Sequence, residues 1–256
     1  MKAIVKSVLF CIVFTALFMA ASFLKGFLPL EYERWSHGII GTLVAFITTF
    51  IFLRIDKRSF VQINLVPNHK TILKFLLGIL IGIALMAPLA VLSIHYSGAA
   101  VEWNTNSNLL SFLLSTAPLI PLAYMEELGF RAYPLETIKE KNGIRIALFI
   151  TSLLFAFYHI ANGWSISSSF MGPFMWGLIF GLGAVAGNGI ALSTGIHYAA
   201  NLTTSAFGAA GTTSLLIVNS QETHAPATNH FQIIISGGLF VFAVILIEFY
   251  IKFTKK

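Results

Sequence analysis

Long runs of apolar residues are the feature that most constrains how this chain can fold. Eight such runs can be distinguished among its 256 residues. They cover residues 4–24, 38–54, 72–96, 109–138, 144–161, 170–186, 189–207 and 232–251. A helix crosses the ~30 Å hydrocarbon core of a bilayer with about 20 residues, so the runs predict about eight transmembrane helices. The sixth and seventh runs are short and nearly continuous, which leaves seven spans with one bent hairpin as the alternative.

The lipid surroundings decide whether the spanning segments are helices or strands. Lipid offers no hydrogen-bond partners, so each spanning segment must be a helix or part of a closed barrel, and the sequence lacks the alternating short strands of a barrel. Charged residues make up only 10% of the chain, against roughly 25% in a soluble domain. We therefore expect an all-α polytopic membrane protein, with residues 1–256 forming one integral-membrane domain and the lipid bilayer as its partner.

The basic residues predict the orientation of the chain in the membrane. With eight spans and a cytosolic N-terminus, the cytosolic segments hold 13 Lys and Arg, and the opposite loops hold only Lys25 and Arg34. The 13 are Lys2, Lys6, Arg54, Lys57, Arg58, Lys70, Lys74, Lys139, Lys141, Arg145, Lys252, Lys255 and Lys256. Both termini are therefore expected in the cytosol. The net charge of +6 does not indicate nucleic acid, because the basic residues form short clusters between apolar runs.

The first apolar run has a second interpretation. Its two lysines, its apolar stretch and the small residues at 20–22 also resemble a cleavable signal peptide. We favour an uncleaved helix, because the run is long and its cleavage site is poor. Cleavage would leave the orientation of the rest unchanged. The single cysteine, Cys11, lies in this run, so no intrachain disulfide can form.

A few ionisable and amide side chains interrupt the apolar runs. They are Glu126, Glu127 and Arg131 in "YMEELGFRAYP", His159 in "FAFYHI", and His197 with Asn201 in "GIHYAANL". Each charge at membrane depth costs roughly 2.5–3.5 kcal/mol, so such residues usually mark function or buried pairing. At ~1.5 Å per residue, Glu126, His159 and His197 lie about 20, 21 and 14 Å from the cytosolic ends of their helices. The remaining histidines fall in loops or at span ends, where we expect solvated surface; they are His37, His69, His95, His224 and His230.

Helix geometry divides these residues by role. Glu127 and Arg131 are four residues apart and can pair on one face, whereas Glu126 points about 100° away without a partner on its helix. An unpaired buried carboxylate suits a general base near neutral pH. His197 and Asn201 are also four apart and can donate to a developing oxyanion. A structural ion pair, a packing histidine or an interhelical bond explains each feature singly. Their matching depth favours a joint functional site.

The same set of polar residues can be compared with the catalytic residues that other classes of protease require. An aspartyl intramembrane protease needs two aspartates, and Asp56 is the only one in the chain. Ser193 lacks a Gly-x-Ser-x-Gly frame, and no His-Glu-x-x-His occurs. A zinc ion held by His159, His197 and Glu126 is the alternative, because two histidines and a carboxylate form a catalytic zinc set.

Three ordered motifs resemble those of the CPBP intramembrane proteases, the family of the CAAX prenyl endopeptidase Rce1 and of bacterial Abi-type immunity proteins. The motifs are Glu126-Glu127-x-x-x-Arg131, Phe155-x-x-x-His159 and His197-x-x-x-Asn201. The resemblance covers residues 109–207, the expected motif-bearing core. It implies an eight-helix fold around a polar cavity open to the cytosol.

The resemblance also implies a glutamate-dependent endopeptidase without a cofactor. Glu126 would activate water with the help of His159, and His197 and Asn201 would stabilise the oxyanion. Glu127, Arg131 and Phe155 would support the site. The implied substrates are peptides or membrane proteins, cleaved near the cytosolic side. The compact loops favour a bacterial cytoplasmic membrane.

Two non-proteolytic functions remain as alternatives. An immunity or scaffold protein could keep the fold and act by binding. A transporter could use Glu126 and the histidines as a proton relay, but the chain shows no matching halves of the kind that transporters have.

Overall fold

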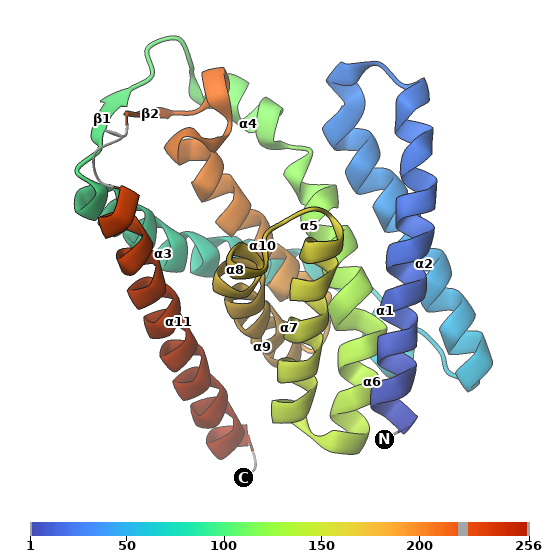
Figure 1. The fold of residues 1–256 in the computed structure, drawn as a ribbon. Coiled ribbons are helices and arrows are strands. Elements are labelled where there is room, and N and C mark those ends of the chain that lie inside the picture. The colour runs from blue at the N-terminus through green and yellow to red at the C-terminus, as the bar shows by residue number, and fades with distance from the viewer. Residues whose placement is uncertain (1, 220–224, 255–256) are drawn as a thin grey trace.

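The computed structural model describes residues 2–219 and 225–254, and it confirms an all-α polytopic membrane protein. Figure 1 shows the helices in chain order. They are α1 Lys2–Ala21, α2 Glu33–Asp56, α3 Thr71–Ser97, α4 Leu109–Thr116, α5 Leu119–Glu127, α6 Tyr133–Asn142, α7 Ile144–Ala161, α8 Ile166–Ser169, α9 Met175–Gly187, α10 Ile190–Thr204 and α11 Ala225–Thr254. Two short strands, β1 Ala100–Trp103 and β2 Leu216–Asn219, pair antiparallel, with Val101 opposite Val218.

Seven helical stretches among the described residues are long and apolar enough to cross a membrane. They are Lys2–Phe27, Leu30–Asp56, Thr71–Ser97, Leu109–Asn142, Ile144–Ala161, Ile166–Gly187 and Ile233–Thr254. The remaining expected run, 189–207, contains α10, which has only 15 residues. A tight turn joins α9 to α10, because Asn188 and Gly189 adopt φ of 49° and 123°. The arrangement therefore combines seven long spans with one short interior helix.

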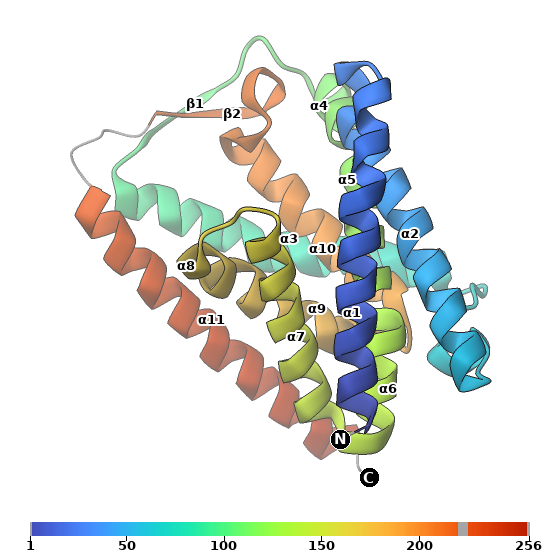
Figure 2. The ribbon, with the colours of Figure 1, turned by 45° about the vertical axis from the view of Figure 1, so that its right-hand side comes forward.

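Helix α10 is held in the interior by close backbone contacts with α3. A Cβ at Gly195 would lie 2.1 Å from the carbonyl oxygen of Phe75, and one at Gly78 would lie 2.3 Å from that of Leu192. Only glycine permits this approach, as in other closely packed membrane helices. Most residues of α10 are buried, including His197. In both views α3 runs across the bundle at a large angle to α1, and α11 runs obliquely to α1 (Figures 1 and 2).

The fourth span contains a π-helical turn, Leu128–Ala132, between α5 and α6. Pro134 explains it, because proline has no N–H for the carbonyl four residues earlier and its ring clashes there. Single π turns inside helices frequently accompany functional sites. Here the turn follows directly after Glu126 and Glu127.

The first helix contributes to the main core. Phe10, Phe14 and Phe18 of α1 are buried. The Phe10 ring stacks 5.1 Å from Tyr133, and Phe14 meets Phe130 edge-on at 5.8 Å. The aromatic side chains of α1 thus pack beside the motif-bearing fourth span.

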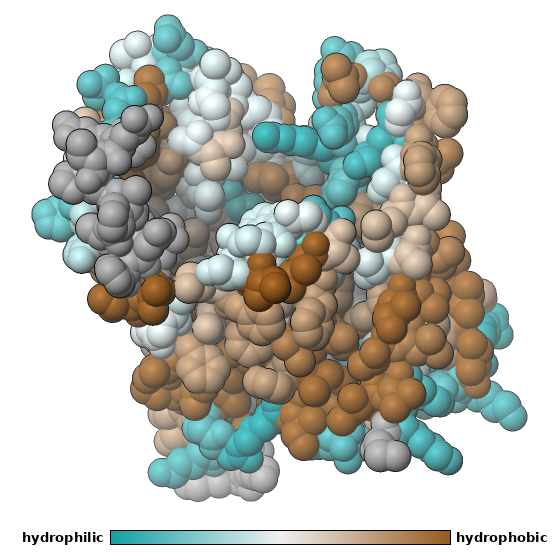
Figure 3. Space-filling model, in the orientation of Figure 1, coloured by the Kyte–Doolittle hydropathy of each residue, from teal (hydrophilic) through white to brown (hydrophobic). Residues whose placement is uncertain are grey.

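The bundle has two distinct ends. The start of α1, the end of α2, the α6–α7 connection and the end of α11 lie at one end, which we call the terminal end (Figures 1 and 2). The α1–α2 connection, the β1–β2 pair and the last turn of α10 lie at the other, the distal end. Figure 3 shows hydrophilic residues at the terminal end below a belt of apolar residues, and a hollow at the distal end.

Candidate active site

His197 of α10 lies between the two adjacent glutamates of α5. Its Nδ1 is 3.0 Å from Oε1 of Glu127, and its Nε2 is 3.4 Å from Oε2 of Glu126. All three side chains are buried, with exposed fractions of 8% for Glu126, 0% for Glu127 and 5% for His197. Glu126 has no partner on its own helix, as expected, but it gains one from α10.

The two carboxylates hold the imidazole in different ways. The Nδ1–H group of His197 donates a hydrogen bond to Glu127, whereas the Glu126 contact is longer than a usual hydrogen bond. The Phe180 ring stacks on the imidazole, with centroids 4.3 Å apart and planes inclined by 14°. Such an outer carboxylate fixes the orientation of a histidine ring. His197 is therefore presented with Nε2 toward Glu126.

Arg131 backs Glu127, as its spacing predicts. Its Nε lies 3.7 Å from Oε2 of Glu127, one helical turn away, and neither side chain is exposed. The guanidinium also donates to the carbonyl oxygen of Gly177 at 3.5 Å and lies 4.2 Å from the centre of the Phe155 ring. Arg131 thus balances the charge of Glu127 through an ion pair that is longer than a hydrogen bond. Its contacts with α7 and α9 hold the guanidinium in place.

Phe155 connects the second motif to the cluster. Its buried ring lies edge-on to both histidines, with centroid distances of 4.6 Å to His159 and 6.0 Å to His197. His159 is half-buried near the end of α7, and its Nδ1 donates to the carbonyl oxygen of Phe155 at 2.9 Å. This bond leaves Nε2 free to accept. Phe155 thus contacts both histidines.

Asn201 lies one turn beyond His197 and lines a cavity of about 450 Å³. Leu122, which lines the same cavity, lies one turn before Glu126 on α5. Side chains four residues apart lie above one another on a helix, so the cavity is positioned over the Glu126–His197 pair. The remaining walls come from the start of α2, from the start of α5, and from the end of α10 with the residues that follow it.

His37 is a residue of this site that the sequence placed among solvated surface positions. It lies in α2, half-buried, and lines the cavity together with Asn201. Its ring meets Phe18 edge-on at 4.8 Å, its Nδ1 is 3.1 Å from Nζ of Lys25, and it interacts electrostatically with Glu126. A residue near the end of a span, such as His37, is not necessarily exposed, because a neighbouring helix can cover it. By contrast, His69 and His95 are exposed, as expected. His224 and the His230 side chain lie outside the described residues.

The cavity lies at the distal end of the bundle. Its walls include Glu33 and Arg34 from the first turn of α2 and Thr204 from the last turn of α10, and both turns belong to that end. The hollow at the distal end in Figure 3 lies between these elements. The described ends of the chain and the cavity lie at opposite ends of the bundle. The expectations of cytosolic termini and of a cavity open to the cytosol therefore cannot both be correct.

The geometry does not assemble the alternative zinc set. Among the residues that the structure describes, no three His, Cys, Asp or Glu side chains are grouped as metal ligands. His197 and Glu126 are close, but His159 stands apart behind Phe155. The trio of His159, His197 and Glu126 would need a rearrangement to bind one ion.

A comparison with protein families identifies the same segment. The family model for type II CAAX prenyl endopeptidases, Rce1-like, matches residues 106–203. This match contains all three motifs and confirms the resemblance that they predict. No curated protein and no solved structure matches the chain. The family suggests an intramembrane protease of the CAAX type, which is a peptide hydrolase.

Proposed function

We propose that this protein is an intramembrane endopeptidase in which Glu126 activates a water molecule for attack on a peptide carbonyl. The observation that carries the proposal is the buried contact between Glu126 and His197, one helical turn from Leu122 and Asn201, which line a cavity. Glu127 and Arg131 hold His197 from the side that faces away from Glu126. A carboxylate, an imidazole and an amide in this arrangement provide a base and hydrogen-bond donors for acyl transfer.

The reaction can be written with these side chains. Water gives a proton to the Glu126 carboxylate as its oxygen bonds to the carbonyl carbon, and the carbonyl oxygen becomes an oxyanion. The Asn201 amide donates to that oxygen. His197, when both of its nitrogens are protonated, keeps one N–H on Glu127 and has the other for the oxyanion. Glu126 then returns its proton to the amide nitrogen as the C–N bond breaks, which regenerates the carboxylate.

His159 has a positioning role in this proposal. Its Nδ1–H is bound to the Phe155 carbonyl, which fixes the ring and leaves Nε2 as an acceptor. In this proposal the acceptor orients the attacking water.

The substrates in this proposal are peptides or membrane proteins, and the setting is the cytoplasmic membrane of a bacterium with both termini in the cytosol. The basic residues of the terminal end support that orientation. No cofactor is required by the chemistry above. Zinc bound by the same cluster is the alternative, and nucleic acid has no part in either.

Comparison of membrane proteomes tests the function. Cells that make the wild-type protein should accumulate cleavage products that are missing from cells that make Glu126→Gln at the same level. Glu248→Gln is a matched control, because Glu248 is a glutamate of α11 paired with Arg145 away from the site. Identical proteomes for wild type and Glu126→Gln would contradict the proposal and favour a binding role.

Metal removal separates the glutamate mechanism from the zinc alternative. Purified protein should keep its peptidase activity after long incubation with a strong chelator and should contain no stoichiometric metal by elemental analysis. A zinc enzyme depends on the metal to lower the pKa of bound water to about 7. Activity lost to the chelator and restored by zinc would therefore favour the alternative.

A further inference from the structure

The cavity above the site opens through polar residues at the distal end. Arg34 and His37 of α2 stand on one side, and Thr204 and Ser205 at the end of α10 stand on another. Arg34 and Thr204 are exposed. In Figure 3 the hollow at this end is surrounded mainly by hydrophilic and intermediate residues rather than by the apolar belt. Because Pro118, Leu119, Leu122 and Ala209 also line the cavity, its walls offer an extended peptide both apolar surface and hydrogen-bond partners.

The opposite side of the site is closed by packed side chains. Below the glutamates, the fourth span continues through Phe130, Tyr133, Leu135 and Ile138, each with an exposed fraction of 0%. Phe130 contacts the rings of Phe14, Phe155 and Tyr158 at centroid distances of 5.8, 5.2 and 5.2 Å. The cavity between the start of α1 and the end of α6 does not include these residues. A second cavity, at the α2–α3 connector, is lined by Tyr124 of α5 and by Ile190 and Thr194 of α10, and it does not include them either. A substrate could pass here only if the core were opened.

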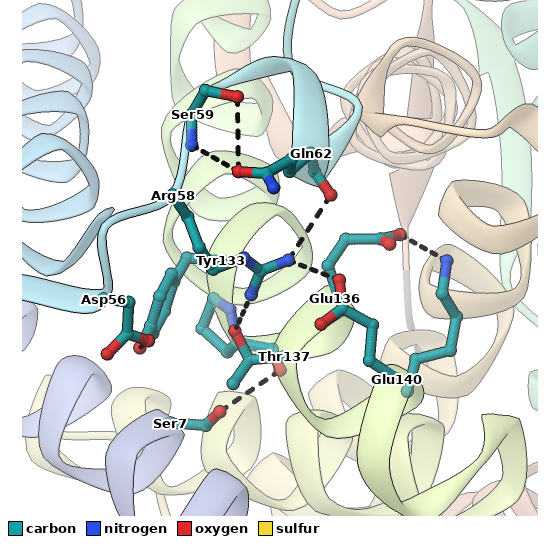
Figure 4. Close-up of polar contacts among 11 residues, drawn as sticks. Ser7, Asp56, Arg58, Ser59, Gln62, Tyr133, Glu136, Thr137 and Glu140 are labelled. Carbon is teal, nitrogen blue, oxygen red and sulfur yellow. Dashed lines mark hydrogen bonds and ion pairs between the residues drawn. The ribbon is translucent and has the colours of Figure 1, made fainter. Parts of the chain in front are cut away.

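A polar network fastens the helices below that packed layer, as Figure 4 shows. Tyr133 donates to Oδ2 of Asp56 at 2.8 Å, and Asp56 also pairs with Lys6 of α1. Ser7 of α1 donates to the carbonyl oxygen of Pro134 at 3.2 Å. These contacts tie α1 and α2 to α6.

The connector after α2 adds to the same network. Arg58 donates to Oγ1 of Thr137 at 3.1 Å and pairs with Glu140. In addition, Ser59 and Gln62 are hydrogen-bonded to each other within the connector. The terminal end is thus tied together across α1, α2, the connector and α6.

Basic residues mark which of the two ends faces the cytosol. The start of α1, the end of α2 with its connector, the α6–α7 connection and the end of α11 carry Lys2, Lys6, Arg54, Lys57, Arg58, Lys139, Lys141, Arg145 and Lys252. The α1–α2 region at the distal end carries Lys25 and Arg34. The positive-inside rule places the terminal end in the cytosol. The open cavity then faces the other side of the membrane.

We infer that the substrate enters from the distal end and that the substrates are polypeptide segments exposed on the extracytosolic face of the membrane. The inference rests on the proposed endopeptidase function and adds the side from which it operates. Entry of cytosolic segments between α1, α2 and α6 is disfavoured, because the packed layer and the polar network lie between that part of the terminal end and Glu126. The sequence predicts cleavage near the cytosolic side. This inference instead has substrates reach the site from the extracytosolic side.

Thiol labelling tests the inference in the full-length protein. Cys11→Ser removes the native thiol, and a single cysteine is then introduced as Thr204→Cys at the cavity or as Lys141→Cys at the terminal end. Right-side-out membrane vesicles receive a membrane-impermeant maleimide. We expect Thr204→Cys to be labelled in sealed vesicles and Lys141→Cys only after permeabilisation. The reverse pattern would overturn the inference.

A second readout separates this inference from the proposed function. Maleimide added outside should remove the peptidase activity of the Thr204→Cys protein and spare that of the Cys11→Ser parent. Activity blocked only by reagent inside the vesicles would overturn the inference while leaving the endopeptidase intact. By contrast, activity that persists in Glu126→Gln would defeat the proposed function whatever the labelling shows.

Discussion

The polar cluster has two halves that differ in what surrounds them. Glu127 and Arg131 are sealed among helices, with exposed fractions of 0% and 1%, and they contact α7, α9 and α10. Glu126 instead meets His197 below a cavity that also contains Asn201. We therefore propose that adjacent residues of one sequence motif have different roles. In this proposal the sealed half maintains the structure, and Glu126 with His197 carries out the chemistry.

The largest expected effect comes from breaking the sealed half. Arg131→Ala leaves Glu127 as a buried carboxylate without its cation, a change that typically costs about 3–5 kcal/mol. We expect loss of both folding and activity, measured as a lower unfolding temperature in detergent and lower peptidase turnover. Arg145→Ala, which removes an exposed ion pair with Glu248, should leave both unchanged. Equal stability of Arg131→Ala and wild type would show that the sealed pair is dispensable.

Asn201→Ala probes the half below the cavity. Removal of one oxyanion donor usually lowers kcat by about 10²–10³, so we expect a loss of that size with an unchanged unfolding temperature. Asn106→Ala, on an exposed turn, is the matched control. A full-rate Asn201→Ala enzyme would remove this amide from the mechanism and leave His197 as the remaining donor.

His37→Ala should give the smallest of these effects. His37 lines the cavity and interacts electrostatically with Glu126, but its hydrogen bond goes to Lys25. We expect about a tenfold loss in kcat/KM, equivalent to ~1.4 kcal/mol of transition-state stabilisation. His95→Ala, at an exposed position of α3, should have no effect. Indistinguishable kinetics for the two variants would return His37 to the role of a surface residue.

Sequence reasoning identifies the spans and the cluster for clear physical reasons. Apolar length predicts helices, and the spacing of Glu127 and Arg131 predicts their pair, because both depend on local helix geometry. The similar depths of His197 and Glu126 in the membrane predict that His197 lies near the glutamates. These features can be read along one helix at a time.

The features that sequence misses depend on how helices are arranged around each other. Nothing in the local pattern shows that α10 is a short interior helix crossing α3 at Gly78 and Gly195. The position of His37 depends on α1 and α5 covering the start of α2. The side on which the cavity opens is likewise a property of the assembled bundle. A depth count places Glu126 in the membrane but cannot say which end is closed.

The two adjacent glutamates allow the most direct test of the account. Glu126→Gln and Glu127→Gln are the same chemical change at neighbouring positions, so turnover and unfolding temperature should be measured for both in one detergent. We predict that Glu126→Gln abolishes turnover and keeps the wild-type unfolding temperature. Glu127→Gln should lower that temperature, because Arg131 loses its buried counter-charge. Substantial turnover in Glu126→Gln, or equal unfolding temperatures for Glu127→Gln and wild type, would contradict the division between a structural and a chemical half.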